Sequence, residues 1–229
     1  MGEKTLDSRK EELAKRYGID FEKLEKEQIA LARDLTLSDK IDFSLTETFG
    51  AIENIFLKNK ILSCMIVVDK NFEIIDQAYV FERINFPYFP GFRSYRELPA
   101  MIKVLERLNE KPDVILVSAQ GIIHPRLGLA SHFGLSTGIP TIGVSSSLVD
   151  AEASDEDNAD ITRDNKKIGK SLKSKKESNA LYISPGDHIT IDSAYKISKE
   201  LINLPHKRPE PIHMVAKYAK SVKKELMIE

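Results

Sequence analysis

The feature that most constrains the fold is a nearly continuous apolar run, Ile61–Val68, which ends at the turn signal Asp69-Lys70-Asn71. A short apolar run bounded by turn residues is typical of a strand in a sheet. Residues 48–56 and 72–82 on either side also have strand patterns, and the connections between the three runs are short. Because short connections join antiparallel neighbours, these runs are predicted to form an antiparallel three-strand meander.

Helical and strand patterns alternate further along the chain. Residues 94–109 place apolar side chains on one helical face, and residues 114–117 form a short apolar run after a turn. Such a run after a crossover helix is typical of a buried parallel strand. Residues 125–138 then predict a Gly-rich helix and residues 141–144 another strand. The order βββαβαβ predicts an α/β fold with a mixed central sheet, flanked by helices.

The two ends of the chain have patterns typical of further helices. Residues 9–36 predict one or two helices, and after a strand at 180–184 two more helices are expected, one near 189–203 and one from Pro211. Between them, residues 150–160 contain six acids and residues 166–176 six lysines. We expect a single domain, 1–229, with an exposed charged loop or hairpin insertion near 150–178.

Composition limits the possible setting but not the function. The net charge is −1, so nucleic-acid binding would depend on local clusters of Lys and Arg. The only cysteine, Cys64, lies in an apolar run and is expected to pack as a small hydrophobe. A charged N-terminus and the lack of an 18-residue apolar stretch argue against export and membrane insertion. We therefore expect a cytoplasmic protein with no membrane association.

Two motifs resemble those of the endonuclease V family. The first is the aromatic, proline-bracketed segment 86–97, Phe-Pro-Tyr-Phe-Pro-Gly-Phe-Arg-Ser-Tyr-Arg-Glu. The second begins as Gly121-Ile122-Ile123-His124-Pro125-Arg126 and continues to Val144, with weaker matches at 184–186 and 209–211. The resemblance spans residues 25–225. It implies an RNase H-like fold and Mg²⁺-dependent hydrolysis of DNA or RNA, 3′ to a deaminated purine such as deoxyinosine or inosine.

The resemblance also implies which residues hold the metal and catalyse. Glu53 stands where the family has its first catalytic Asp, and Glu97 matches the family's Glu. At the third carboxylate position this chain has Ser118, which lacks the charge that Mg²⁺ prefers. The other interpretations are a solvated Glu53 on an edge strand and a Glu97 that closes a capping box with Ser94.

Two further positions depart from the family pattern. Ser146 stands at the position of a family lysine, and Ala216 at that of a C-terminal histidine. Asp113 cannot replace the missing Asp because it precedes Ser118 by five residues, about 17 Å along an extended strand. Asp187 is the better candidate for that replacement.

The recognition residues that the resemblance implies are better kept. They are Pro87, Tyr88, Phe89, Pro90, Gly91, Gly121, His124 and Arg126. Tyr88, held between two prolines, would wedge into a base stack, although it is also interpretable as a buried aromatic. His124 has an equal interpretation as a structural hydrogen-bonding histidine. Phosphate contacts are expected from Arg93, Arg96 and Arg126, and a basic track from the lysines at 166–176, unless these are solvated surface.

Three functions agree with these observations. The first is a Mg²⁺-dependent endonuclease that recognises deaminated purine in DNA or RNA, and we expect it to act as a monomer. The second is a degenerate relative that binds such nucleic acid without cutting it. The third is a pseudoenzyme whose scaffold serves protein contacts through the acidic 150–160 segment.

Overall fold

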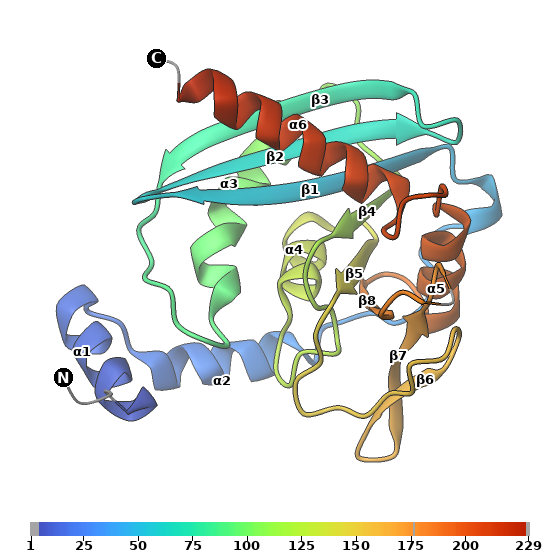
Figure 1. Ribbon diagram of the computed structural model, residues 1–229. Helices are drawn as coiled ribbons and strands as arrows, with labels where there is room; N and C mark the ends of the chain where they lie inside the picture. Colours follow the sequence, from blue (N-terminus) through green and yellow to red (C-terminus); the bar gives the residue numbers. More distant parts are fainter. Residues whose placement is uncertain (1–4, 176, 228–229) are drawn as a thin grey trace.

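The computed structural model describes residues 5–175 and 177–227, and an eight-stranded mixed sheet forms its centre (Figure 1). The strands lie in the order β3-β2-β1-β4-β5-β8-β7-β6. Their bounds are β1 Thr48–Leu57, β2 Lys60–Asp69, β3 Ile74–Arg83, β4 Val114–Val117, β5 Thr141–Ser145, β6 Asp160–Arg163, β7 Lys166–Leu172 and β8 Leu181–Asp187.

The predicted strand order is confirmed. Strands β1, β2 and β3 pair as an antiparallel meander, while β4 is parallel to β1 and β5 is parallel to β4. Strand β8 returns antiparallel to β5. Strand β3 starts two residues later than expected, because Asp69 Oδ1 accepts hydrogen bonds from the backbone N–H groups of Asn71 and Glu73 and thereby lengthens the turn.

The helices are α1 Leu6–Tyr17, α2 Phe21–Leu31, α3 Arg93–Arg107, α4 Leu129–Thr137, α5 Ile191–Glu200 and α6 Glu210–Leu226. Helices α5 and α6 pack on one face, and α3 and α4 on the other. The apolar run in β2 follows from this layering: Leu62 and Ile66 face α6, whereas Met65 and Val67 face α3. Cys64 is fully buried, and burial raises the pKa of its thiol to about 12, so it packs as a hydrophobe as expected.

Helix α4 begins at Leu129 and not at the predicted residue 125. The preceding segment is a loop, and Gly128 is extended there with the backbone of Gln120 against it. A Cβ atom at Gly128 would lie 2.2 Å from the carbonyl oxygen of Gln120. Gly128 therefore allows the loop to pass close to the end of β4 before the helix starts.

The charged 150–178 segment contributes the hairpin of β6 and β7, which extends the sheet beyond β8. Several of its lysines form ion pairs with acids, among them Lys167 with Asp160 (3.1 Å) and Lys170 with Asp192 (3.2 Å). These pairs weaken the expectation of a free basic track. Among the residues that the structure describes, no helix is both long and apolar enough to cross a membrane.

Candidate nucleic-acid interface and metal centre

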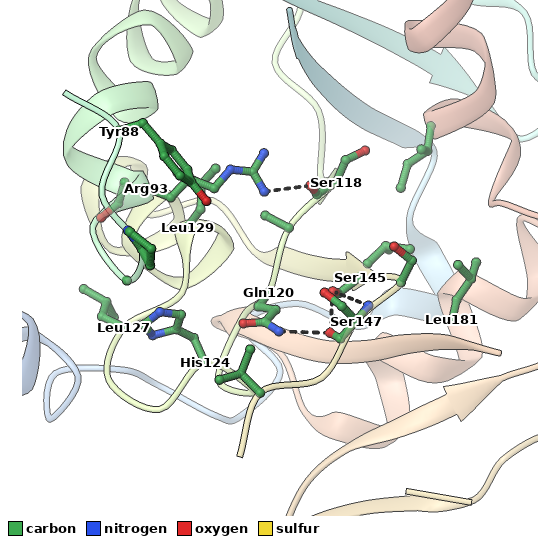
Figure 2. Close-up of a pocket in the computed structure, with 18 of the residues that line it drawn as sticks. Tyr88, Arg93, Ser118, Gln120, His124, Leu127, Leu129, Ser145, Ser147 and Leu181 are labelled. Atoms are coloured by element: carbon green, nitrogen blue, oxygen red, sulfur yellow. Dashed lines mark hydrogen bonds between the residues drawn. The ribbon is translucent and has the colours of Figure 1, made fainter. Parts of the chain in front are cut away.

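A cleft of about 400 Å³ opens where β4 and β5 end (Figure 2). Its walls come from the segment 88–94, the end of β4 at 118–120, the end of β5 at 144–147, and Arg208 before α6. The volume is within the range of pockets that hold a small ligand. The cleft thus brings together three segments that the motifs singled out.

Glu53 lies beside Ser118, which lines this cleft. Ile52 of β1 pairs with Val117 of β4 in parallel register. The residues that follow them, Glu53 and Ser118, are therefore neighbours. Strand β1 lies inside the sheet between β2 and β4, so the interpretation of Glu53 as a residue on an edge strand is wrong. Burial raises the pKa of Glu53, and the nearby Ser118 hydroxyl and Arg208 guanidinium partly offset this.

Glu97 is buried beside them, with 1% of its surface exposed. Arg93, one turn earlier on α3, forms an ion pair with Glu97 Oε1 and also donates to Oε2 (3.1 Å). Asn54 Nδ2 of β1 donates to the same Oε2 (2.8 Å). The alternative interpretation of Glu97 as part of a capping box with Ser94 is wrong, because α3 begins at Arg93 and its N-cap residue, Phe92, makes no side-chain cap.

Four buried oxygens at this site have no hydrogen-bond partner among residues 5–175 and 177–227. They are Glu53 Oε2, Asn54 Oδ1, Ser94 Oγ and Ser118 Oγ. Buried polar atoms are nearly always satisfied by protein, water or an ion, so this corner of the cleft is suited to a polar ligand. Arg93 also reaches across the cleft to the Ser118 carbonyl oxygen (3.4 Å; Figure 2).

Tyr88 stands on the rim of the cleft with 55% of its surface exposed, which excludes the buried-aromatic interpretation. The residues on either side hold it: Pro87 and Phe89 are buried, and Phe89 packs against Phe21 of α2 with ring centroids 5.0 Å apart. Pro90 and Gly91 also line the cleft. An exposed ring on a rigid, anchored loop has the form of a stacking wedge.

Helix α2 fixes the loop that carries Tyr88. Gln28, which is fully buried, donates to the Gly91 carbonyl oxygen (2.9 Å) and accepts from Arg126 Nε (2.7 Å). Arg126 also donates to the same carbonyl oxygen (3.2 Å) and lies over the Phe92 ring. The structure therefore assigns Arg126 to supporting the loop, and Arg96, which donates to the Phe86 carbonyl oxygen (2.7 Å), has a similar role.

His124 lies in the cleft and also makes a structural hydrogen bond. Its Nδ1 accepts from the backbone N–H of Arg126 (3.2 Å), which leaves the proton of the neutral ring on Nε2. Burial, with the charges of Arg126 and Arg163, lowers the pKa of His124 to about 4. At neutral pH the ring thus offers an N–H donor without a charge.

The comparisons with known proteins agree with this geometry. Residues 29–217 match the family model described as Endonuclease V. This chain belongs to the endonuclease V family. It is 32% identical over 216 residues to endonuclease V of Thermosipho melanesiensis, with 90% of each chain covered, and 29% identical over 212 residues to that of Archaeoglobus fulgidus, covering 91% of this chain and 96% of the relative.

Solved endonuclease V structures have the same RNase H-like fold. The Bacillus subtilis protein is 26% identical, with a TM-score of 0.83 over 91% of this chain and 94% of its own. The Ciona intestinalis protein, solved with a 24mer DNA containing an inosine followed by a ribo-adenosine, is 21% identical, with a TM-score of 0.79 over 90% and 98%. The expected α/β architecture is thereby confirmed.

The remaining positions that the sequence motifs singled out are spread over several elements. Gly121 is buried and its backbone N–H donates to Ser184 Oγ (3.0 Å), so it supports the cleft from behind. Ser146 is exposed on the cleft wall, and Ala216 is half-buried on α6. Asp187 does not replace the missing carboxylate, because it pairs with Thr141 at the start of β5 and its Oδ1 accepts from Thr36 N (2.8 Å) at the opposite end of the sheet.

Sequence reasoning missed two arginines that shape the cleft. Arg208 lines it from the loop before α6. Arg163 of β6 donates to the carbonyl oxygens of Ile123 and Val149, and so ties the hairpin to the loop that carries His124. Their only signal in the sequence is a basic residue in a connecting segment, which is too common to single out a site.

The residues of this centre fit a Mg²⁺ ion poorly. Mg²⁺ needs near-octahedral oxygen ligands, supplied by one or two carboxylates together with water and substrate. Both Glu97 oxygens already accept hydrogen bonds from Arg93 and Asn54, and Ser118 supplies only a hydroxyl. The guanidinium groups of Arg93 and Arg208 also place positive charge beside Glu53.

Proposed function

We propose that this chain recognises a deaminated purine in nucleic acid, and that its phosphodiester cleavage is strongly reduced. The observation that carries the proposal is the contrast between the two halves of the cleft. The exposed Tyr88 stands on an anchored loop beside an open cleft, whereas Glu97 is held by Arg93 and Asn54. Recognition groups are present, whereas Glu97, one of the two candidate metal carboxylates, is already engaged by other side chains.

Recognition would proceed by exchanging a base between the stack and the cleft. Tyr88 would insert into the stack where the purine leaves, at a cost of a few kcal/mol that contacts in the cleft offset. A deaminated purine has a carbonyl oxygen at position 6, where adenine has an amino group. The Nε2–H of His124 donates to a carbonyl oxygen and repels an amino group, so it favours the deaminated base.

Relatives support this substrate class. The Ciona intestinalis endonuclease V was solved with inosine-containing DNA, and its fold matches that of this chain. Arg93 and Arg208, with their side chains at the cleft, are suited to the flanking phosphates. DNA and RNA both satisfy this geometry, and binding of either would weaken as salt concentration increases.

A working Mg²⁺-dependent nuclease is the second candidate. It is favoured by the unpartnered oxygens of Glu53 and Ser118, which a cation arriving with a substrate phosphate would satisfy. That arrangement requires Arg93 to leave Glu97 and pair with the substrate. Nicking of an inosine-containing oligonucleotide in Mg²⁺ or Mn²⁺, abolished by Glu97→Ala, would favour this candidate.

The test of recognition is a gel shift with oligonucleotides that differ only at one inosine or adenosine. We expect tighter binding of the inosine oligonucleotide and a loss of roughly tenfold in affinity in Tyr88→Ala, because one stacked base contributes about 1–3 kcal/mol. Tyr79→Ala, a change at another exposed tyrosine on β3, is the matched control. Equal binding of both oligonucleotides, or equal effects of the two variants, would contradict the proposal.

We further propose that the chain acts as a monomer of a single domain in the cytoplasm. The shared sheet supports the single domain, since the hairpin of β6 and β7 pairs directly with β8. The cytoplasmic setting is supported by the lone cysteine, Cys64, which is buried and so forms no disulfide. Sedimentation of the purified protein tests the monomer, and a dimer would contradict it.

A further inference from the structure

The loop after α5 leads into α6 at one end of the sheet (Figure 1). A second group of metal-ligating side chains lies there, outside the cleft centre. It consists of His206 in the loop, with Glu210 and His213 on the first turn of α6. One ligand atom from each residue lies within 4.8 Å of the other two. His206 Nδ1 is 2.6 Å from Glu210 Oε2, and the two imidazole rings stack with centroids 3.6 Å apart.

The backbone holds these three residues in place without help from a ligand. The N–H of Glu210 donates to the Leu201 carbonyl oxygen (2.7 Å), and the N–H of His206 donates to that of Asn203 (2.9 Å). The helix then sets His213 three residues after Glu210, so the two side chains share a face. The group is therefore preorganised, which lowers the entropy cost of binding an ion.

The donor set has the chemistry of a transition-metal site. Glu210 is 8% exposed, so its carboxylate is almost wholly removed from water, and a buried carboxylate needs a cation or several donors. Two imidazoles with one carboxylate are ligands of Zn²⁺ and its neighbours, and they leave the fourth tetrahedral position open. Mg²⁺ prefers oxygen ligands and is disfavoured here.

A simpler interpretation is that His206 only pairs with Glu210. That pair accounts for the 2.6 Å contact, but it gives no role to His213, whose ring nitrogens make no hydrogen bond among residues 5–175 and 177–227. Stacking also brings the second imidazole against the first without a hydrogen bond between them. An ion shared by all three side chains would replace the proton between His206 and Glu210 and would give His213 a partner.

We propose that His206, Glu210 and His213 bind one borderline transition-metal cation, of the class of Zn²⁺, which joins the loop after α5 to α6. The site is separate from the Glu53 and Glu97 centre and does not depend on nucleic-acid recognition. Lys207 in the same loop and Lys217 on the next turn of α6 carry positive charge, so binding is expected to be reversible by a chelator. Because the ion binds the folded chain, it stabilises the fold.

The experiment uses the full chain without added histidines, freed of metal with a chelator and titrated with Zn²⁺ in calorimetry and in competition with a chromophoric indicator. We expect one ion per chain, a Zn²⁺-dependent rise in melting temperature, and tetrahedral absorption bands when Co²⁺ is used. His213→Ala and His206→Ala should each weaken affinity at least about tenfold.

Glu210→Gln tests the carboxylate while keeping the size of the side chain, and it should also weaken binding. His188→Asn is the matched control, because His188 lies away from the group at a left-handed backbone position (φ 55°) that asparagine tolerates. It should bind Zn²⁺ as the unchanged protein does. The proposal would be overturned if His213→Ala bound Zn²⁺ as tightly as the unchanged protein does. It would also be overturned if His188→Asn weakened Zn²⁺ binding as much as His213→Ala does.

Discussion

Arg93 governs how much of the Glu97 charge is available to a cation. Its guanidinium group contacts both oxygens of a carboxylate that is 1% exposed, while its own side chain is 46% exposed. In Arg93→Met the carboxylate keeps only the Asn54 amide. The half-exposed position of Arg93 reduces what the ion pair contributes, because solvent screens it.

We therefore expect Arg93→Met to lower the free energy of unfolding by about 1–2 kcal/mol and to strengthen Mg²⁺ binding. Urea denaturation with and without Mg²⁺ measures both effects, since an ion that binds only the folded chain raises its stability. Arg107→Met, at the far end of α3, is the matched control. Unchanged stabilisation by Mg²⁺ in Arg93→Met would show that Arg93 does not compete with the ion.

Single residues were the hardest features to predict. The motifs placed Glu53, Glu97, Ser118, Tyr88 and His124 in the sequence, and the fold brings their segments to one cleft. The sequence did not show that Arg93 engages Glu97, because a residue at i−4 on a helix has several possible partners. Asp187 was an incorrect candidate for a different reason. Strand β8 runs antiparallel to β5, which residue spacing does not reveal, so Asp187 lies at the other end of the sheet.

The loop that carries Tyr88 depends on α2, an element that the sequence predicted as a helix without a role. Gln28 is fully buried and links the Gly91 carbonyl oxygen to Arg126. In Gln28→Ala both hydrogen bonds are lost, and Arg126 Nε is left without its partner. A buried group without a partner costs about 1–3 kcal/mol.

We expect Gln28→Ala to lower the free energy of unfolding by about 1–3 kcal/mol and to weaken the preference for inosine over adenosine. Chemical denaturation and gel shifts measure the two effects. Gln77→Ala, an exposed glutamine on β3, controls for the loss of an amide side chain. If Gln28→Ala were destabilised but kept its full preference for inosine, α2 would support the fold alone and not the wedge.

Elements were easier to predict than their ends. The apolar run of β2 and the helical periodicity of α3 depend on burial, which side-chain chemistry reports directly. The predicted start of α4 was wrong by four residues. The loop before it is set by contacts between Gly128 and the backbone of Gln120, and the local sequence pattern does not report such a contact. The hairpin of β6 and β7 remained undecided in the sequence because its strands are polar and partly exposed.

Across the whole molecule, the burial of His124 links stability to pH. The pKa of His124 is lowered from 6.5 to about 4, so between these values the unfolded chain binds a proton that the folded chain does not. Stability is therefore fully present above about pH 6.5 and is lost as the pH falls towards 4. His132 is affected in the same direction by burial, so a variant is needed to isolate His124.

In His124→Asn we expect the difference in unfolding free energy from the unchanged protein to shrink as the pH falls from 7 to 4. Urea denaturation of both proteins at several pH values measures this difference, and the contribution of His132 cancels because both proteins contain it. A difference that stays constant with pH would mean that folding does not lower the pKa of His124. The structure would then not hold the ring in its neutral form more strongly than the unfolded chain does.

The most direct test of the whole account measures binding and nicking of one inosine-containing oligonucleotide in Mg²⁺, for the unchanged protein and for Ser118→Asp combined with Arg93→Met. We predict that the unchanged protein binds the oligonucleotide selectively but nicks it slowly, and that the double variant nicks at least about tenfold faster, because a third carboxylate is added and Glu97 is released. Ser118→Asn with Arg93→Met controls for size without charge. Rapid nicking by the unchanged protein, with no gain in the double variant, would contradict the account.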